Sequence, residues 1–251
     1  MADVPVHLDP TQTGPTQTGP AGLARFYAFE GLDGSGKSTQ ATLLRDALER
    51  QGLKPLQRRE PTDGSEGRLI RERASSGALS IAPHLEMELY LADRLRDVNE
   101  KILPALKAGH PVIIDRYVLS NVAYQGARGA YAPLDILALN ENFPRPDLTF
   151  LLDVPPELAL SRVGARGGPR SGYENLAYLT KVKAIYDSLA SPEPLAGGQP
   201  RPGGLPYPGL VRIDGRLAPD QVHALVLKAV RELDLSQSGY WPSLRPAGPE
   251  V

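Results

Sequence analysis

The residues best suited to chemistry lie in a glycine-rich stretch near the N-terminus. Residues 29–40 read Phe-Glu-Gly-Leu-Asp-Gly-Ser-Gly-Lys-Ser-Thr-Gln, and they complete the pattern G-x-x-x-x-G-K-[ST] between Gly31 and Ser38. Glycines let backbone N–H groups turn inward around an anion, and a following helix adds unpaired donors and its positive dipole end. The stretch therefore predicts a polyphosphate site, with Lys37 reaching the β and γ oxygens and Ser38 joining the coordination of Mg²⁺.

The sequence around this pattern has the order that a phosphate-binding P-loop needs. A short apolar run (26–29) precedes it, and a helical run (38–49) follows. The alternative, a glycine-rich turn with an incidental lysine, does not account for the strand and the helix. We therefore expect the loop to bind nucleotide through Gly31, Leu32, Asp33, Gly34, Ser35, Gly36, Lys37, Ser38 and Thr39.

A second set of charged residues follows the apolar run 111–114, which has the pattern of a buried parallel strand. Asp115 and Arg116 come at its C-terminal end. An acidic residue next to a P-loop strand holds the water shell of Mg²⁺, and an arginine beside it can bind phosphate through two hydrogen bonds. Residues 120–126 are polar enough to read a base or a sugar, although Ser120 could instead be a helix N-cap.

Two more segments place polar residues near the predicted ligand edge. Residues 54–59 predict a strand that runs into Arg58-Arg59-Glu60-Pro61 and the turn-rich residues 62–67. A solvated charge cluster is the alternative there. Residues 84–103 predict the longest helix, which Pro104 breaks or kinks. Tyr90 and Arg94 lie four residues apart and point the same way, unless they are only a packing residue and a surface charge. The buried stripe of this helix comprises Leu91, Leu95, Val98 and Ile102.

The second half of the chain supplies further strands and a candidate lid. We expect a strand at 147–153, a helix beginning at 156–163, a helix at 173–190, a strand at 210–213 and a helix from Pro219. Between them, residues 164–172 are rich in glycine and carry Arg166 and Arg170, as a closing lid requires, although an exposed loop could look the same. The proline-dense residues 191–209 are interpreted as an insertion of unknown role. The last helix is expected to bury Val222, Leu225, Val226, Ala229 and Leu233.

Composition limits the remaining possibilities. The 251 residues are 41% hydrophobic, carry a net charge of −1 and contain no cysteine. Such a chain can bury the core of one domain, and it has no disulfide or zinc–thiolate site. Nothing in its charge favours a nucleic-acid partner, and no apolar run is long enough to span a membrane. No secretory signal is recognisable, so a cytoplasmic location is expected.

Domain organisation and fold class follow from these segments. Residues 1–24 repeat Thr-Gln-Thr-Gly-Pro and are expected to be a disordered tail, residues 25–235 the domain, and residues 236–251 a C-terminal tail. Five buried strands alternating with helices, with charges at strand ends, predict a doubly wound α/β fold. With the P-loop, this is a three-layer P-loop NTPase sandwich with a five-stranded parallel sheet flanked by helices and an arginine-bearing lid of about 164–174.

Taken together, the motifs resemble those of thymidylate kinase. The resemblance rests on residues 29–40, Arg-Glu-Pro at 59–61, Leu-Ala-Asp-Arg at 91–94, Asp-Arg-Tyr at 115–117 and Ser-Asn-Val-Ala-Tyr-Gln-Gly at 120–126, in the family's order and spacing. It covers roughly residues 25–234 and leaves out both tails. It implies transfer of the ATP γ-phosphoryl group to dTMP, with Mg²⁺ as metal, in dTTP biosynthesis, and a homodimer.

The resemblance also implies roles for individual residues. Asp33 would orient the acceptor near its sugar, and Arg59 and Arg116 would hold the acceptor phosphate. Tyr90 would stack on the base, where the family usually has phenylalanine. The other acceptor residues would be Arg94 and Asn121 at the thymine edge, Tyr124 against the 2′ carbon, and Gln125.

The family has two branches that differ in the source of positive charge at the γ-phosphate. One branch has an arginine within the P-loop, and the other has basic residues in the lid. Here positions 32–35 are Leu-Asp-Gly-Ser, so the lid must supply the charge through Arg166 or Arg170. Yet residues 173–175 (Tyr-Glu-Asn) resemble the first branch, and the choice between the two arginines stays open.

Two alternatives are weighed against this interpretation. Another deoxynucleotide or deoxynucleoside kinase could share the scaffold, and Tyr90 and Asn121 are the positions that would distinguish it. A P-loop nucleotide-binding switch is the candidate from a different class. It would need an Asn-Lys-x-Asp guanine-reading motif, which the sequence lacks, and it leaves the acceptor-site arginines unexplained.

Overall fold

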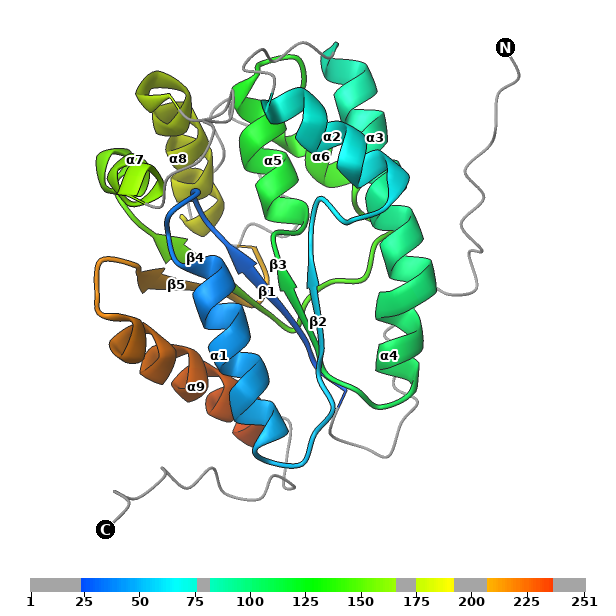
Figure 1. Cartoon of the computed structure of the whole chain (residues 1–251), viewed down its shortest axis with the longest axis vertical. Helices are drawn as coiled ribbons and strands as arrows, with labels where there is room; N and C mark the ends of the chain where they lie inside the picture. The colour runs from blue at the N-terminus through cyan, green and yellow to red at the C-terminus, as the bar shows by residue number, and fades with distance from the viewer. Residues whose placement is uncertain (1–23, 76–81, 166–174, 192–206, 237–251) are drawn as a thin grey trace.

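The computed structural model describes residues 24–75, 82–165, 175–191 and 207–236. Within these ranges, parallel strands form one five-stranded sheet in the order β2-β3-β1-β4-β5, with helices on both faces (Figure 1). This confirms the predicted α/β fold class. The strands are β1 (Phe26–Glu30), β2 (Leu56–Arg59), β3 (Val112–Asp115), β4 (Leu148–Asp153) and β5 (Leu210–Asp214). The helices are α1 (Lys37–Glu49), α2 (Ser65–Ser75), α3 (Pro83–Asp97), α4 (Leu103–Lys107), α5 (Val118–Ala127), α6 (Pro133–Leu139), α7 (Pro156–Ala165), α8 (Leu176–Ala190) and α9 (Pro219–Ser236), with a π-helical turn at Val98–Ile102.

The central strand β1 divides its side chains between two hydrophobic layers. Phe26 and Ala28 pack into the layer that lies under α3, α5 and α8, whereas Tyr27 and Phe29 pack into the layer under α1 and α9. Figure 1 shows α1 and α9 side by side over the second face. Because helices cover both faces, the strands β1, β3 and β4 are buried and apolar along nearly their whole length.

The register of the sheet brings the polar strand ends together. Phe29 of β1 pairs with Asp115 of β3, and Asp115 pairs in turn with Arg59 of β2. All strands are parallel, so the P-loop after β1 and the charged ends of β2 and β3 meet at the carboxyl edge. None of the helices in the described ranges is long and apolar enough to cross a lipid bilayer.

The long helix predicted at 84–103 continues past Pro104 after a change of hydrogen-bond pattern. The N–H of Leu103 donates to the carbonyl of Val98, five residues earlier, and Pro104 then lies in the first turn of α4. Proline has no N–H and crowds the preceding turn, so a wider π-helical turn just before it accommodates the ring.

Four details of the sequence interpretation were wrong or incomplete. Helices α2 and α6 were not predicted, and α2 begins inside the stretch expected to be turn-rich. Ser120 is no N-cap, because α5 begins at Val118. Leu225 is 41% exposed, whereas Val230 is buried. The covered stripe of α9 repeats every four residues, and Leu225 lies outside it on the solvent side.

Candidate active site

The P-loop backbone has a shape that requires glycine at two close contacts. Gly31, Gly34 and Gly36 have φ angles of 135°, 87° and 101°. A Cβ on Gly31 would lie 2.5 Å from the carbonyl oxygen of Leu152, and one on Gly34 would lie 2.4 Å from that of Ala159. The loop is therefore held between β4 and α7, in a conformation that L side chains rarely adopt.

Lys37 is a buried cation at the start of α1. Its Nζ donates to the Leu32 carbonyl oxygen at 2.8 Å, so the lysine folds over its own loop. Burial, followed by repulsion from Arg116, lowers the pKa of Lys37 to about 8, although nearby carboxylates partly oppose this shift. A lysine held in this way is stabilised in its charged form by any anion that approaches it.

Ser38 and Asp115 form the predicted metal pair. The Ser38 hydroxyl donates to Oδ2 of Asp115 at 2.5 Å, while Oδ1 of Asp115 is buried and has no hydrogen-bond partner in the described ranges. A hydroxyl and a carboxylate with an unused oxygen fit the ligand preferences of Mg²⁺. No cluster of three or more acidic or histidine side chains suited to a metal occurs among these residues. An ion here would therefore need phosphate and water oxygens as well.

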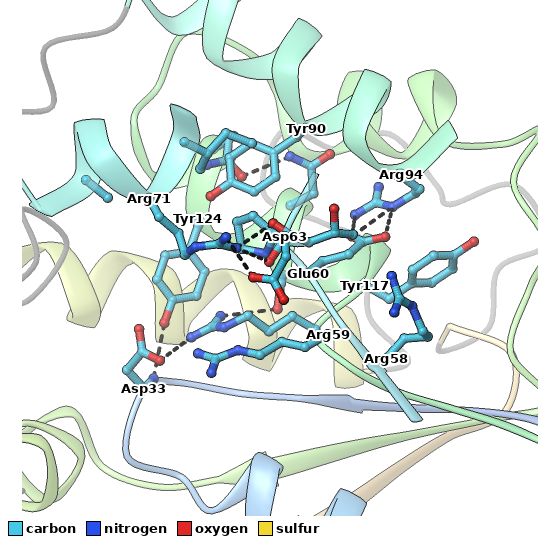
Figure 2. Close-up of a pocket in the computed structure, with 18 of the residues that line it drawn as sticks. Asp33, Arg58, Arg59, Glu60, Asp63, Arg71, Tyr90, Arg94, Tyr117 and Tyr124 are labelled. Atoms are coloured by element: carbon cyan, nitrogen blue, oxygen red, sulfur yellow. Dashed lines mark hydrogen bonds and ion pairs between the residues drawn. The ribbon is translucent and has the colours of Figure 1, made fainter. Parts of the chain in front are cut away.

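A cavity of about 930 Å³ lies beside the loop at the carboxyl edge of the sheet. Asp33 is the P-loop residue that reaches into it. Figure 2 shows Asp33 and Tyr124 at one end of the cavity, and Tyr90 and Arg94 at the other. The structure thus brings all the predicted acceptor residues to one cavity, which they share with Asp33: Arg59, Tyr90, Arg94, Arg116, Asn121, Tyr124 and Gln125.

Asp33 and Arg116 join the P-loop to the cavity by an ion pair. Burial opposes ionisation of Asp33, but Arg116 and Lys37 together hold the pKa of its carboxyl well below the usual range. The N–H of Asp33 also donates to the Tyr124 hydroxyl at 3.2 Å, and the Arg116 guanidinium lies 5.0 Å from the centre of the Tyr124 ring. Arg116 has a φ of 71°, an unusual conformation for a side chain of its size and typical of functional sites.

Glu30 supports this arrangement from behind, and sequence reasoning assigned it no role. Its buried carboxylate accepts hydrogen bonds from the backbone N–H of Tyr117 at 3.0 Å, from the Ser120 hydroxyl, and from the Tyr186 hydroxyl at 3.3 Å. Burial raises the pKa of Glu30 in spite of these donors. Glu30 therefore ties the end of β1 to α8 and to the start of α5, directly after Arg116.

Arg94 is fully buried, so its alternative interpretation as a surface charge is wrong. Its Nη2 lies 2.5 Å from Oε2 of Glu60, and the same guanidinium donates to Asn140 and lies 4.8 Å from the centre of the Tyr117 ring. Burial raises the pKa of Glu60 to about 7, although Arg94 opposes the shift. Glu60 was seen in the sequence only as part of a motif, and no signal singled out Asn140.

The side chains of the two arginines at the end of β2 differ in their partners. Arg58 pairs with Asp97 of α3, whereas the Arg59 side chain is exposed, lines the cavity, and forms no ion pair or hydrogen bond with another described residue. Arg59 therefore remains available to an anion. Arg71 of α2 also lines the cavity and pairs with Asp63 at 2.9 Å. Sequence reasoning missed Arg71 because it missed the helix that carries it.

The predicted lid arginines, Arg166 and Arg170, lie outside the described residues. Asn175 lies immediately beyond that segment, and its side chain accepts a hydrogen bond from the N–H of Tyr178 at 2.8 Å as the cap of α8. Most of the insertion 191–209 and of both tails is likewise outside the described ranges. The last residues of the insertion, 207–209, are described, and the Gly209 carbonyl accepts a hydrogen bond from the N–H of Thr149 in β4.

Comparison with known proteins accounts for this combination of P-loop and polar cavity. The family described as thymidylate kinase matches residues 29–195. The chain belongs to the thymidylate kinase family. A thymidylate kinase of Akkermansia muciniphila is 40% identical over 207 residues, which are 82% of this chain and 91% of that protein. A probable thymidylate kinase of Archaeoglobus fulgidus is 46% identical over 160 residues, 63% of this chain and 79% of its own. The thymidylate kinase of Xanthomonas campestris is 45% identical over 166 residues, 66% and 71% of the two chains.

Proposed function

We propose that the protein transfers the γ-phosphoryl group of ATP to dTMP, giving ADP and dTDP. The observation that carries the proposal is the Asp33–Arg116 ion pair, which joins a phosphate-binding loop to a second, polar cavity of nucleotide size. A kinase needs two adjacent sites of this kind, one for the donor and one for the acceptor. A nucleotide-binding switch needs only the first.

The P-loop would bind the donor. Its backbone N–H groups and the N-terminus of α1 would surround the β-phosphate, and Lys37 would move from the Leu32 carbonyl to the β and γ oxygens. Ser38 and Asp115 would hold Mg²⁺, directly or through its water. When bound, the ion neutralises charge on the two phosphates that the reaction separates.

The cavity would bind the acceptor. Arg59 and Arg116 would hold the monophosphate, because a guanidinium fork matches phosphate oxygens. Tyr90 would stack on the base, and Arg94 and Asn121 would face its edge. The remaining cavity residues would be Tyr124, against the sugar 2′ carbon, and Gln125 near the base.

The chemical step follows from these positions. An oxygen of the acceptor phosphate attacks the γ-phosphorus, the bond from that phosphorus to the β–γ bridging oxygen breaks, and ADP leaves. The transition state is loose, so positioning and charge neutralisation matter more than a nucleophilic side chain. Asp33 would keep Arg116 aligned with the acceptor phosphate, and Arg166 or Arg170 would add positive charge at the transferred group.

The test is ADP release from purified protein with ATP and Mg²⁺. The acceptors to compare are dTMP, dUMP, dCMP, AMP and thymidine, with a control that lacks acceptor. We expect dTMP to give the highest kcat/KM. Preference for another acceptor would retain the kinase and overturn the assignment of Tyr90, Arg94 and Asn121. Slow ADP release that ignores every acceptor would favour the nucleotide-binding switch.

Two broader properties are proposed from family resemblance. We expect a homodimer, which light scattering of the purified protein would reveal as twice the 27.1 kDa chain mass. A cytoplasmic location is also proposed, because the substrates are small nucleotides made and used there. Fractionation of the source cells tests it.

A further inference from the structure

A row of buried hydrogen bonds lies behind the side of the cavity where Arg94 and Asn121 are proposed to face the base. Gln125 donates through Nε2 to Oε1 of Glu86 at 3.1 Å, and its Oε1 accepts from Nδ2 of Asn121 at 2.9 Å. Oδ1 of Asn121 accepts from Nδ2 of Asn140 at 3.2 Å, and Oδ1 of Asn140 accepts from Arg94. Every donor in the row points the same way, from Arg94 towards Glu86.

The first end of this row can accept but cannot donate. Glu86 is 1% exposed and forms an ion pair with Arg128, and a carboxylate in an ion pair offers only acceptor oxygens. The amide of Gln125 must therefore turn its NH₂ group towards Glu86. Its carbonyl oxygen is then left to face Asn121.

The opposite end is fixed just as strictly. Nδ2 of Asn140 donates to the backbone carbonyl of Ile136 at 2.7 Å, and a carbonyl oxygen cannot donate. On its other side, Asn140 meets Arg94, whose guanidinium cannot accept. The amide of Asn140 has one satisfied orientation, in which its NH₂ faces Oδ1 of Asn121. The orientation of all three amides thus follows from their fixed neighbours.

This orientation determines what remains for a ligand. Asn121 uses its carbonyl on Asn140 and one N–H on Gln125, so its second N–H is the group left over at the cavity. Arg94 has five N–H groups, and its hydrogen bonds to Glu60 and Asn140 involve three of them. The unused groups of both residues are donors. The C2 carbonyl is common to dTMP and dCMP, so these donors discriminate between the two where they face C4: they complement a carbonyl there and oppose an amino group.

We propose that Glu86 and Asn140 are positioning residues that set the selectivity of the cavity for a pyrimidine with a carbonyl at C4 over one with an amino group there. This rests on the proposed function. Neither residue lines the cavity, so both act through the amides that do. Replacing either one removes the constraint that fixes the row.

The test compares dTMP, dUMP and dCMP as acceptors for the full chain and for Glu86→Gln. The new amide must turn its carbonyl to Arg128, so its NH₂ then faces the NH₂ of Gln125 and the row has no consistent orientation. We expect the ratio of kcat/KM for dTMP to that for dCMP to fall by about tenfold or more. The ratio of kcat/KM for dTMP to that for dUMP should stay constant, because both bases present a carbonyl at C4.

The matched control is Glu88→Gln, an exposed position two residues along α3, which should leave both ratios unchanged. Asn140→Ala provides a second variant, since it frees the amide of Asn121 without touching Glu86, and should lower the same dTMP-to-dCMP ratio. General destabilisation would lower kcat/KM for every acceptor alike and leave the ratios unchanged. Unchanged dTMP-to-dCMP ratios in both Glu86→Gln and Asn140→Ala would overturn the inference.

The two proposals fail in different ways. If the unsubstituted protein does not phosphorylate dTMP, the proposed function is wrong. If it does so and both variants keep its dTMP-to-dCMP ratio, the function stands and the role of Glu86 and Asn140 is wrong.

Discussion

At the scale of single residues, the charge state of Lys37 couples binding to protons. Its pKa of about 8 lies well below that of a free lysine, because burial and Arg116 disfavour the ammonium form. A polyphosphate anion beside Nζ would favour that form and raise the pKa again. At pH values between the pKa of Lys37 in the free protein and its higher pKa in the bound protein, the two forms hold different numbers of protons.

We therefore expect nucleotide binding above pH 8 to take up as much as about one proton per site. The uptake should vanish below about pH 7, where Lys37 is protonated in both states. Calorimetry of ATP binding in two buffers of different ionisation enthalpy measures it. Lys37→Met is the control, and uptake that persists in this variant would assign the proton to another group.

The sequence predicted the residues that line the cavity better than those that support it. Asp33, Arg94 and Arg116 belong to short motifs with a recognisable spacing, and all three lie where the motifs indicated. Glu86 and Asn140 were missed because their amide partners in the row, Gln125 and Asn121, lie far away along the chain and on another helix. A single sequence carries no pattern for such contacts.

At the scale of elements, the P-loop depends on the close approach of α7. Gly34 faces the Ala159 carbonyl at a distance that leaves no room for a Cβ, while Gly52, after α1, has a similar φ of 81° and no neighbour within 4 Å. The two glycines share a backbone requirement and differ in packing. They form a natural pair for separating the two effects.

Gly52→Ala should lower the free energy of unfolding by about 1–2 kcal/mol, the cost of an L residue in the left-handed region. Gly34→Ala should cost at least about 2 kcal/mol more, because α7 or the loop must also shift. Urea unfolding of both variants measures the difference. Equal losses of unfolding free energy in the two variants would mean that α7 or the loop shifts without an energetic cost.

Strands and long helices were predicted more accurately than short helices. Buried strands such as β3 are marked by continuous apolar runs, whose type is easy to recognise. Helix α2 was hidden by Gly64 and Gly67, which favour a turn; a Cβ on Gly67 would in fact lie 2.0 Å from the Thr62 carbonyl oxygen. That glycine serves close packing at a helix start, which local propensity does not distinguish from a turn.

At the scale of the whole molecule, the two edges of the sheet have different tasks. The carboxyl edge holds the site, whereas the amino edge joins the start of β1, the start of β4 and the end of α9. Arg25 lies 3.6 Å from Asp147 and 3.5 Å from Asp234, and both carboxylates are raised in pKa chiefly by burial. The pKa of Asp234 reaches about 6.

This shift has a definite sign for stability. The folded protein disfavours the Asp234 carboxylate, so the cost is fully present above about pH 6 and is lost as the pH falls towards 4. An asparagine side chain at this position would resemble the neutral acid. We expect Asp234→Asn to raise the free energy of unfolding by about 1 kcal/mol at pH 7.5, with no gain near pH 4.

Thermal unfolding at the two pH values measures this effect, with the exposed Glu141→Gln as control. A loss of stability at pH 7.5 would show that the ion pair with Arg25 outweighs the burial of the carboxylate.

The glycine contacts of the P-loop have one more consequence, which concerns entropy. Gly31 and Gly34 have positive φ angles and pack against carbonyl groups of β4 and α7, which belong to the fold itself, too closely for a Cβ. The backbone freedom of the loop, about 1–2 kcal/mol per residue, is therefore lost once, when the chain folds. A nucleotide that enters and leaves at every turnover meets a rigid cradle, and its binding energy remains available to align the two phosphates for reaction.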